Sequence, residues 1–172
     1  GVGVNRLEFV NGTVIDVTHD FAGGGAGTVT LDADGAAGNP ATVVTYSQLQ
    51  PVSDQLTTTN RTFNFSAAND AVTLQDDGTA GDGVSQLVSP TNFSGFSFNG
   101  PTGSLTINLG DGRDALTVAG LDSAAIQAVT AIGGDDIDTL IGTDGVDVFT
   151  VNATDEGTMV TGGLTTTFSE FE

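Results

Sequence analysis

The sequence lacks cysteine, lysine and tryptophan, and it contains a single histidine. Without cysteine, the chain can form no disulfide bond and offers no thiolate as a metal ligand or nucleophile. Three arginines stand against 22 acidic residues, which gives a formal net charge of −19. Binding to nucleic acid or to an anionic membrane requires a basic patch, so we expect neither partner. No apolar run reaches the roughly 18 residues of a membrane span, so we expect no direct membrane insertion.

The sequence also lacks the usual signals of an enzyme. The only histidine, His19, stands between Thr18 and Asp20, and no serine lies in a Gly-x-Ser-x-Gly motif. A Ser-His-Asp triad is therefore not indicated. Paired acids such as Asp76-Asp77 could serve a glycosidase, but one tyrosine and no tryptophan leave few groups to hold a sugar. We predict a protein that is not an enzyme, with His19 at the surface or at a strand end.

Glycine, threonine and aspartate are abundant instead, and 46 residues are Leu, Ile, Val or Phe, which is enough for a hydrophobic core. Apolar and polar residues alternate in short runs bounded by Gly, Asp, Asn or Pro, a pattern typical of strands with one buried face. Only Ser123–Ala131 could form a helix, of two turns at most. We predict an all-β fold with strands at Val29–Leu31, Phe63–Phe65, Val72–Leu74, Phe96–Phe98, Leu105–Leu109, Leu116–Val118 and Phe149–Val151.

Parts of the chain repeat one another. Residues 63–74 align without gaps on residues 107–118, an offset of 44, and the latter align on residues 131–140, an offset of 24. Repetition of this kind is typical of a β-solenoid, in which the chain returns to the same face once per rung. We take 44 as twice 22, which predicts a right-handed parallel β-helix or β-solenoid with 22 to 24 residues per rung and an intervening rung between Asn64 and Asn108. A β-sandwich is the alternative.

The solenoid makes a specific prediction about three acidic residues. Asp70, Asp114 and Asp138 occupy equivalent positions of the repeat, so they should lie in one column. Stacked carboxylates repel each other unless a cation or a proton lies between them. We find no domain boundary and expect residues 1–172 to form a single module, one repeat of a longer tandem array.

Three segments approach the nonapeptide Gly-Gly-x-Gly-x-Asp-x-apolar-x, a calcium-binding β-roll repeat. They are residues 109–117, 133–141 and 142–150, each departing from the pattern at one glycine. Glycine permits the turn, aspartate supplies a hard oxygen ligand, and the apolar residue fills the interior. The candidate metal ligands are Asp111, Asp114, Asp135, Asp138, Asp144 and Asp147.

On these motifs the chain resembles a module of the giant bacterial secreted or surface proteins that carry hemolysin-type (RTX) calcium-binding repeats. The resemblance implies an extracellular or cell-surface location and calcium as the ion. It also implies calcium between turns two nonapeptides apart, whereas Asp138 and Asp147 are only nine residues apart and would face opposite sides. A site in which Asp111 and Asp114 stack on Asp135 and Asp138 is the alternative arrangement.

The expected function is structural: a rigid, non-enzymatic spacer in an adhesin, stalk or extracellular filament. Neighbouring copies or modules of the same protein are the expected partners, with contacts at residues 1–17 and 164–172, because exposed strand edges bind other strands. Surface glycans are a further candidate partner, and a polysaccharide-binding or polysaccharide-degrading β-helix is the alternative function. The runs Thr57–Thr59 and Thr165–Thr167 are explained by the strand preference of threonine rather than by an ice-binding array.

Overall fold

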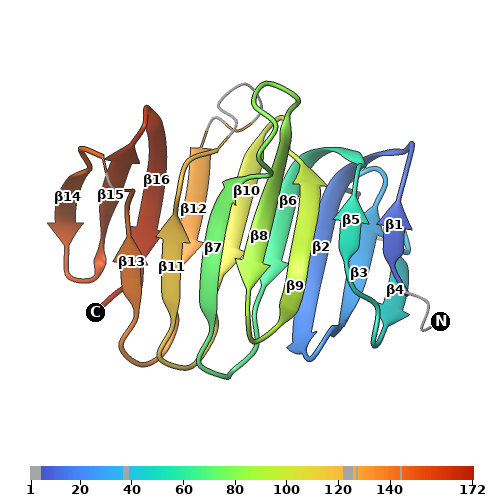
Figure 1. Ribbon diagram of the computed structural model, residues 1–172, viewed down its shortest axis with the longest axis horizontal. Coiled ribbons are helices and arrows are strands. Elements are labelled where there is room, and N and C mark those ends of the chain that lie inside the picture. The colour runs from blue at the N-terminus through green and yellow to red at the C-terminus, as the bar shows by residue number, and fades with distance from the viewer. Residues whose placement is uncertain (1–4, 37–38, 122–125, 127, 144) are drawn as a thin grey trace.

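The protein is all-β, with two mixed sheets that face each other and do not close into a barrel. The computed structural model describes residues 5–36, 39–121, 126, 128–143 and 145–172, and these residues form sixteen strands and no helix. The strands lie side by side along the long axis of the molecule, with the N-terminal strands at one end of that axis and the C-terminal strands at the other (Figure 1). The all-β prediction is therefore confirmed.

One sheet, here called sheet A, has seven strands in the order β1-β5-β9-β8-β7-β11-β13. All neighbours are parallel except β8, which runs antiparallel to β7 and β9. The bounds of its strands are Leu7–Phe9 (β1), Val52–Asp54 (β5), Ala71–Asp76 (β7), Val84–Ser89 (β8), Phe93–Asn99 (β9), Ala115–Val118 (β11) and Thr139–Ile141 (β13).

The other sheet, sheet B, has nine strands in the order β14-β15-β16-β12-β10-β6-β2-β3-β4. Five of them, β2, β6, β10, β12 and β16, form a parallel centre, and an antiparallel hairpin extends the sheet at each end. Their bounds are Thr13–Gly23 (β2), Ala26–Asp32 (β3), Thr42–Tyr46 (β4), Thr57–Asn64 (β6), Ser104–Asn108 (β10), Ala128–Ile132 (β12), Val148–Ala153 (β14), Glu156–Thr161 (β15) and Leu164–Ser169 (β16).

The internal repeats of the sequence correspond to the strand pairing. Asn64 pairs with Asn108 and Ala71 with Ala115, both at an offset of 44, while Ala115 pairs with Thr139 at an offset of 24. The prediction of an intervening rung between Asn64 and Asn108 is wrong, because the two residues lie on adjacent strands. Extra strands lengthen these repeats: β3 and β4 lie between β2 and β6, and β8 and β9 lie between β7 and β10.

The core lies between the two sheets and is built by the alternation of buried and exposed residues along each strand. Sheet B contributes residues such as Phe63 and Leu105, sheet A residues such as Phe96 and Leu116, and all four are at most 1% exposed. The rings of Phe63 and Phe96 meet edge to face with centroids 5.3 Å apart, so the two inner faces are in contact.

The structure corrects two further expectations. The helix expected at Ser123–Ala131 is wrong where the structure describes that segment, because residues from Ala128 onward form β12, while residues 122–125 and 127 lie outside the described part. The residues expected at the module ends are also not all edges. β2 lies between β3 and β6, and β16 lies between β12 and β15. The free edges of sheet B are β4 and β14.

Candidate functional site

Three buried aspartates form a column across sheet A, at the turn that precedes β7, β11 and β13. Asp70, Asp114 and Asp138 are each 3% exposed. The backbone N–H of Asp70 donates to Oδ1 of Asp114 at 2.7 Å, and the N–H of Asp114 donates to Oδ1 of Asp138 at 2.7 Å. The prediction that these three residues share a column is confirmed. The carboxylates of Asp114 and Asp138 thus replace a backbone acceptor at a turn, where the ladder of the parallel strands has not yet begun.

The second carboxylate oxygen of two of these residues has no partner. Oδ2 of Asp114 and Oδ2 of Asp138 are buried and accept no hydrogen bond. Loss of solvation by burial therefore raises the pKa of Asp114 to about 6, and it also raises the pKa of Asp138. Asp70 differs, because the side chains of Asn92 and Thr91 donate to its Oδ1 at 2.7 and 3.2 Å.

Glycines make the close stacking of these turns possible. A Cβ on Gly134 would overlap the carbonyl oxygen of Gly110, one strand away in the stack, and Gly134 has a φ of 116°. No other residue type tolerates both conditions. The glycine and the aspartate of the nonapeptide therefore have a structural role in this chain.

The remaining predicted ligands do not join the column. Asp111 and Asp135 are exposed at the turn tips, where the backbone N–H of Gly112 donates to the carbonyl oxygen of Asp135 at 3.2 Å. Asp147 accepts a hydrogen bond from Thr143 at 3.3 Å, and Asp144 lies outside the described residues. Within the described part of the chain, no three carboxylate or imidazole side chains converge as metal ligands would.

The sequence analysis missed a charged cluster at the centre of the core. His19, Asp54 and Arg61 are each 0% exposed. Nε2 of His19 donates to Oδ2 of Asp54 at 2.8 Å, and the same oxygen accepts from Nη1 of Arg61. Arg61 also donates to the Leu56 carbonyl oxygen at 3.2 Å, and the Leu56 N–H donates to Oδ1 of Asp54 at 2.9 Å.

The expectation of a surface position for His19 is therefore wrong. Its ring lies 5.3 Å from that of Phe63 and 4.7 Å from that of Phe96, measured between centroids. Burial lowers the pKa of His19 and outweighs the opposite effect of Asp54. For Asp54 burial alone would raise the pKa, but the hydrogen bond from His19 and the charge of Arg61 hold it below its usual range. The signal was present in the alternation, since His19 stands between Val17 and Phe21 at inward-facing positions.

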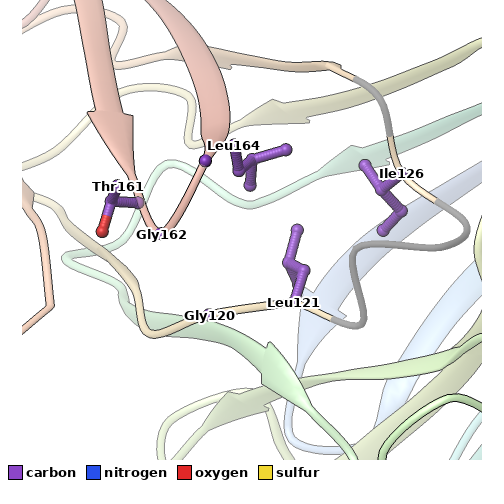
Figure 2. A pocket seen from close by; sticks show the side chains of 7 residues that line it. Gly120, Leu121, Ile126, Thr161, Gly162 and Leu164 are labelled. Carbon is purple, nitrogen blue, oxygen red and sulfur yellow. The ribbon is translucent and has the colours of Figure 1, made fainter.

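A small cavity opens between the end of β11 and the turn joining β15 to β16 (Figure 2). Its volume is about 140 Å³. The side chains of Leu121, Ile126 and Leu164 lie around it, and Thr161 supplies the only side-chain hydroxyl of its described lining. The described lining holds no acid or base that could activate the Thr161 hydroxyl, so the cavity does not resemble a catalytic site.

The comparisons with known proteins do not assign a family. No family model matches the chain, and neither a curated protein nor a solved structure matches it significantly. Among the described residues, no helix is long and apolar enough to cross a membrane.

Proposed function

We propose that the protein is a non-enzymatic structural module of a secreted or cell-surface bacterial adhesin, stalk or extracellular filament. In this proposal it serves as an axial spacer. The observation that carries it is the direction of the backbone ladders. Strands stack along the long axis, hydrogen bonds between them run along that axis, and the N-terminal and C-terminal strands lie at opposite ends (Figure 1). A module of this shape adds its whole length to an array.

We further infer that the chain winds as a β-solenoid rather than as a sandwich of independent hairpins. The support is the parallel pairing at offsets of 44 and 24, which joins β6 to β10 and β12, and β7 to β11 and β13. Parallel strands need crossover connections, and here each crossover passes to the opposite sheet. The hairpins β3–β4, β8–β9 and β14–β15 are then insertions into the coil.

Calcium is the proposed ion. The unpartnered Oδ2 atoms of Asp114 and Asp138 support this, because a buried carboxylate oxygen without a donor is stabilised by a cation. A hollow lies between the turn that carries Asp135, the β14–β15 turn and the segment after β16, and its acidic lining would raise the local concentration of cations. The acidic residues are Asp135, Asp155, Glu156, Glu170 and Glu172. Calcium that binds only the native state would stabilise the module after export.

Binding of polysaccharide is the alternative function, and retention on a column separates the two. The protein is passed over immobilised acidic and neutral polysaccharides with calcium present, and the polymer is then examined for shortening. The spacer elutes without delay and leaves the polymer intact. Retention or chain shortening would contradict the structural proposal and support the alternative.

A further inference from the structure

Sheet B extends beyond sheet A, since it has nine strands where sheet A has seven. At the C-terminal end β13 is the last strand of sheet A, while β15 and β14 continue sheet B (Figure 1). At the other end β4 is the last strand of sheet B. A second molecule that approaches along the long axis therefore meets β14 at the C-terminal end, and at the other end it meets β4 together with β1, the edge strand of sheet A (Figure 1).

β14 is an edge strand with an uncovered inner face. All six of its residues are exposed. Phe149 pairs with Met159 and so points to the same side of the sheet, yet Phe149 is 48% exposed and Met159 is 0% exposed. Val151, two residues further along the same face, is 70% exposed. These side chains belong to the core by position, and sheet A ends before it covers them.

Both free edges of sheet B lack the usual protection against pairing. Edge strands in soluble proteins carry charges or proline to prevent other strands from adding to them. Neither β4 (Thr-Val-Val-Thr-Tyr) nor β14 (Val-Phe-Thr-Val-Asn-Ala) contains a charged residue or a proline, although the chain has 22 acidic residues. Val43 of β4 is 59% exposed. The two edge strands of sheet B therefore carry no charge on an otherwise acidic molecule.

The two edges have the same direction. β4 runs antiparallel to β3 and β3 antiparallel to β2, so β4 is parallel to β2; in the same way β14 is parallel to β16. The strands from β2 to β16 are parallel in turn. A copy placed head to tail thus brings β4 beside β14 in parallel, the pairing used in the centre of the sheet.

The register follows from a straight row on the outer face of sheet B. One residue of each strand pairs with the next across the whole sheet, and eight of the nine are threonine. In strand order from β4 to β14 the row is Val43, Thr30, Thr18, Thr62, Thr106, Thr130, Thr167, Thr158 and Thr150.

We propose that β14 of one copy pairs in parallel with β4 of a second copy, with Thr150 beside Val43 and Val151 beside Val44. Val44 pairs with the buried Val29 and so faces inward. In the proposed register it lies beside Val151, on the same inner face as Phe149. The contact is heterologous and leaves a free edge at each end, so it extends into a filament rather than closing into a ring. This pairing rests on the proposed function, because it specifies how one axial spacer contacts the next.

The absence of cysteine allows a direct test. Val43→Cys and Thr150→Cys are made in separate copies, mixed and oxidised mildly. Adjacent strands lie about 4.8 Å apart, within the Cα distance that a disulfide spans. The pairing predicts a mixed disulfide dimer of Val43→Cys with Thr150→Cys. In the control, Thr106→Cys replaces Thr150→Cys; Thr106 belongs to the same row but lies on an interior strand. We expect the dimer with Thr150→Cys to be at least tenfold more abundant than the dimer with Thr106→Cys.

Two outcomes would overturn the pairing. The first is an equal yield of mixed disulfide with Thr150→Cys and with Thr106→Cys. The second is a disulfide formed only between two Thr150→Cys copies, which would indicate a two-fold contact of β14 with itself. A second variant, Val151→Lys, places a charge on an exposed edge position and should abolish concentration-dependent association in sedimentation velocity while its circular dichroism is unchanged. Retained association would contradict the proposal. If no mixed disulfide forms but a covalent fusion of two copies is still a rigid rod, the pairing is wrong and the spacer function stands.

Discussion

The backbone N–H of Asp114 donates a 2.7 Å hydrogen bond to Oδ1 of Asp138, a residue 24 positions later in the chain. The same relationship joins Asp70 to Asp114 across 44 residues. One oxygen of each accepting carboxylate thereby joins adjacent strands, while the other, Oδ2, is buried without a donor. The column therefore specifies the register of sheet A at an electrostatic cost.

Replacing Asp114 with asparagine should reveal that cost. Asparagine keeps an oxygen for the Asp70 N–H and removes the buried charge, so we expect Asp114→Asn to be more stable at pH 7 by about 1 to 3 kcal/mol. The native pKa is about 6 and the ordinary value 3.8. In the wild type, the folded form binds the proton first, so its Asp114 contribution to stability rises as pH falls from about 6 to 4. The variant lacks this contribution.

Urea unfolding of both proteins from pH 7.5 to pH 4.5 measures the effect. Asp77, a partly exposed loop residue, serves as the control, and Asp77→Asn should not show the stabilisation at pH 7 that is expected of Asp114→Asn. The measurement is made in calcium-free buffer, where no cation offsets the buried charge. A less stable Asp114→Asn protein at pH 7 would contradict the electrostatic cost assigned to Asp114.

The opposite pH dependence is expected from His19. Its pKa is lowered in the folded protein, where Asp54, Arg61 and Asp20 are the charged groups that act on it. Below the ordinary pKa of 6.5, His19 binds a proton in the unfolded chain but stays neutral in the folded protein. The folded state therefore loses stability relative to the unfolded state as the pH falls. His19→Gln, which can still donate to Asp54, should therefore gain stability relative to wild type on acidification from pH 7 to pH 5. The melting temperatures of both proteins are measured from pH 7 to pH 5. If the difference between the two melting temperatures is the same at every pH, the role assigned to His19 is wrong.

Breaking the buried ion pair should be severe. Arg61→Met fills a similar volume but leaves Asp54 buried without its guanidinium partner, and we expect a loss of about 3 to 5 kcal/mol. Arg113→Met, at an exposed turn position, should change stability by less than about 0.5 kcal/mol. Chemical denaturation followed by circular dichroism compares the two, and equal effects would contradict the role assigned to Arg61.

The sequence predicted the column because repetition preserves register. The Asp-x-apolar spacing recurs at the same point of each repeat, so alignment alone brought Asp70, Asp114 and Asp138 together. The rung length could not be read in the same way. The strands β8 and β9 are inserted within one repeat, and an offset of 44 resembles two short rungs of 22. The core cluster was missed because charge was taken as a sign of exposure, although His19 and Arg61 occupy inward positions of their strands.

The turn glycines allow a test of the stacking itself. Gly134→Ala would place a Cβ against the Gly110 carbonyl oxygen and at a positive φ, and we expect a loss of more than about 3 kcal/mol. Gly81 also has a positive φ of 86° but open space around it, so Gly81→Ala should cost only about 1 kcal/mol. The melting temperatures of the two variants measure the difference, and a Gly134→Ala protein no less stable than Gly81→Ala would show that the turns are not in contact.

Calcium binding is tested by isothermal titration calorimetry on chelator-treated protein. We expect a saturable site at or below millimolar calcium that is lost in Asp138→Ala, because that carboxylate has a buried oxygen without a donor. Asp82→Ala, which changes an exposed loop acid, is the control and should bind as the wild type does. If the wild type shows no heat of binding at millimolar calcium, calcium is not the ion of this module.

If the module is an axial spacer, each copy adds a fixed length to an array. Two copies joined from Glu172 to Gly1 are compared with a single copy by small-angle X-ray scattering in calcium-containing buffer. We expect a rod whose maximum dimension is larger by about one module length, with an unchanged cross-section. A broad distribution of dimensions, or a compact particle with the two copies side by side, would contradict it.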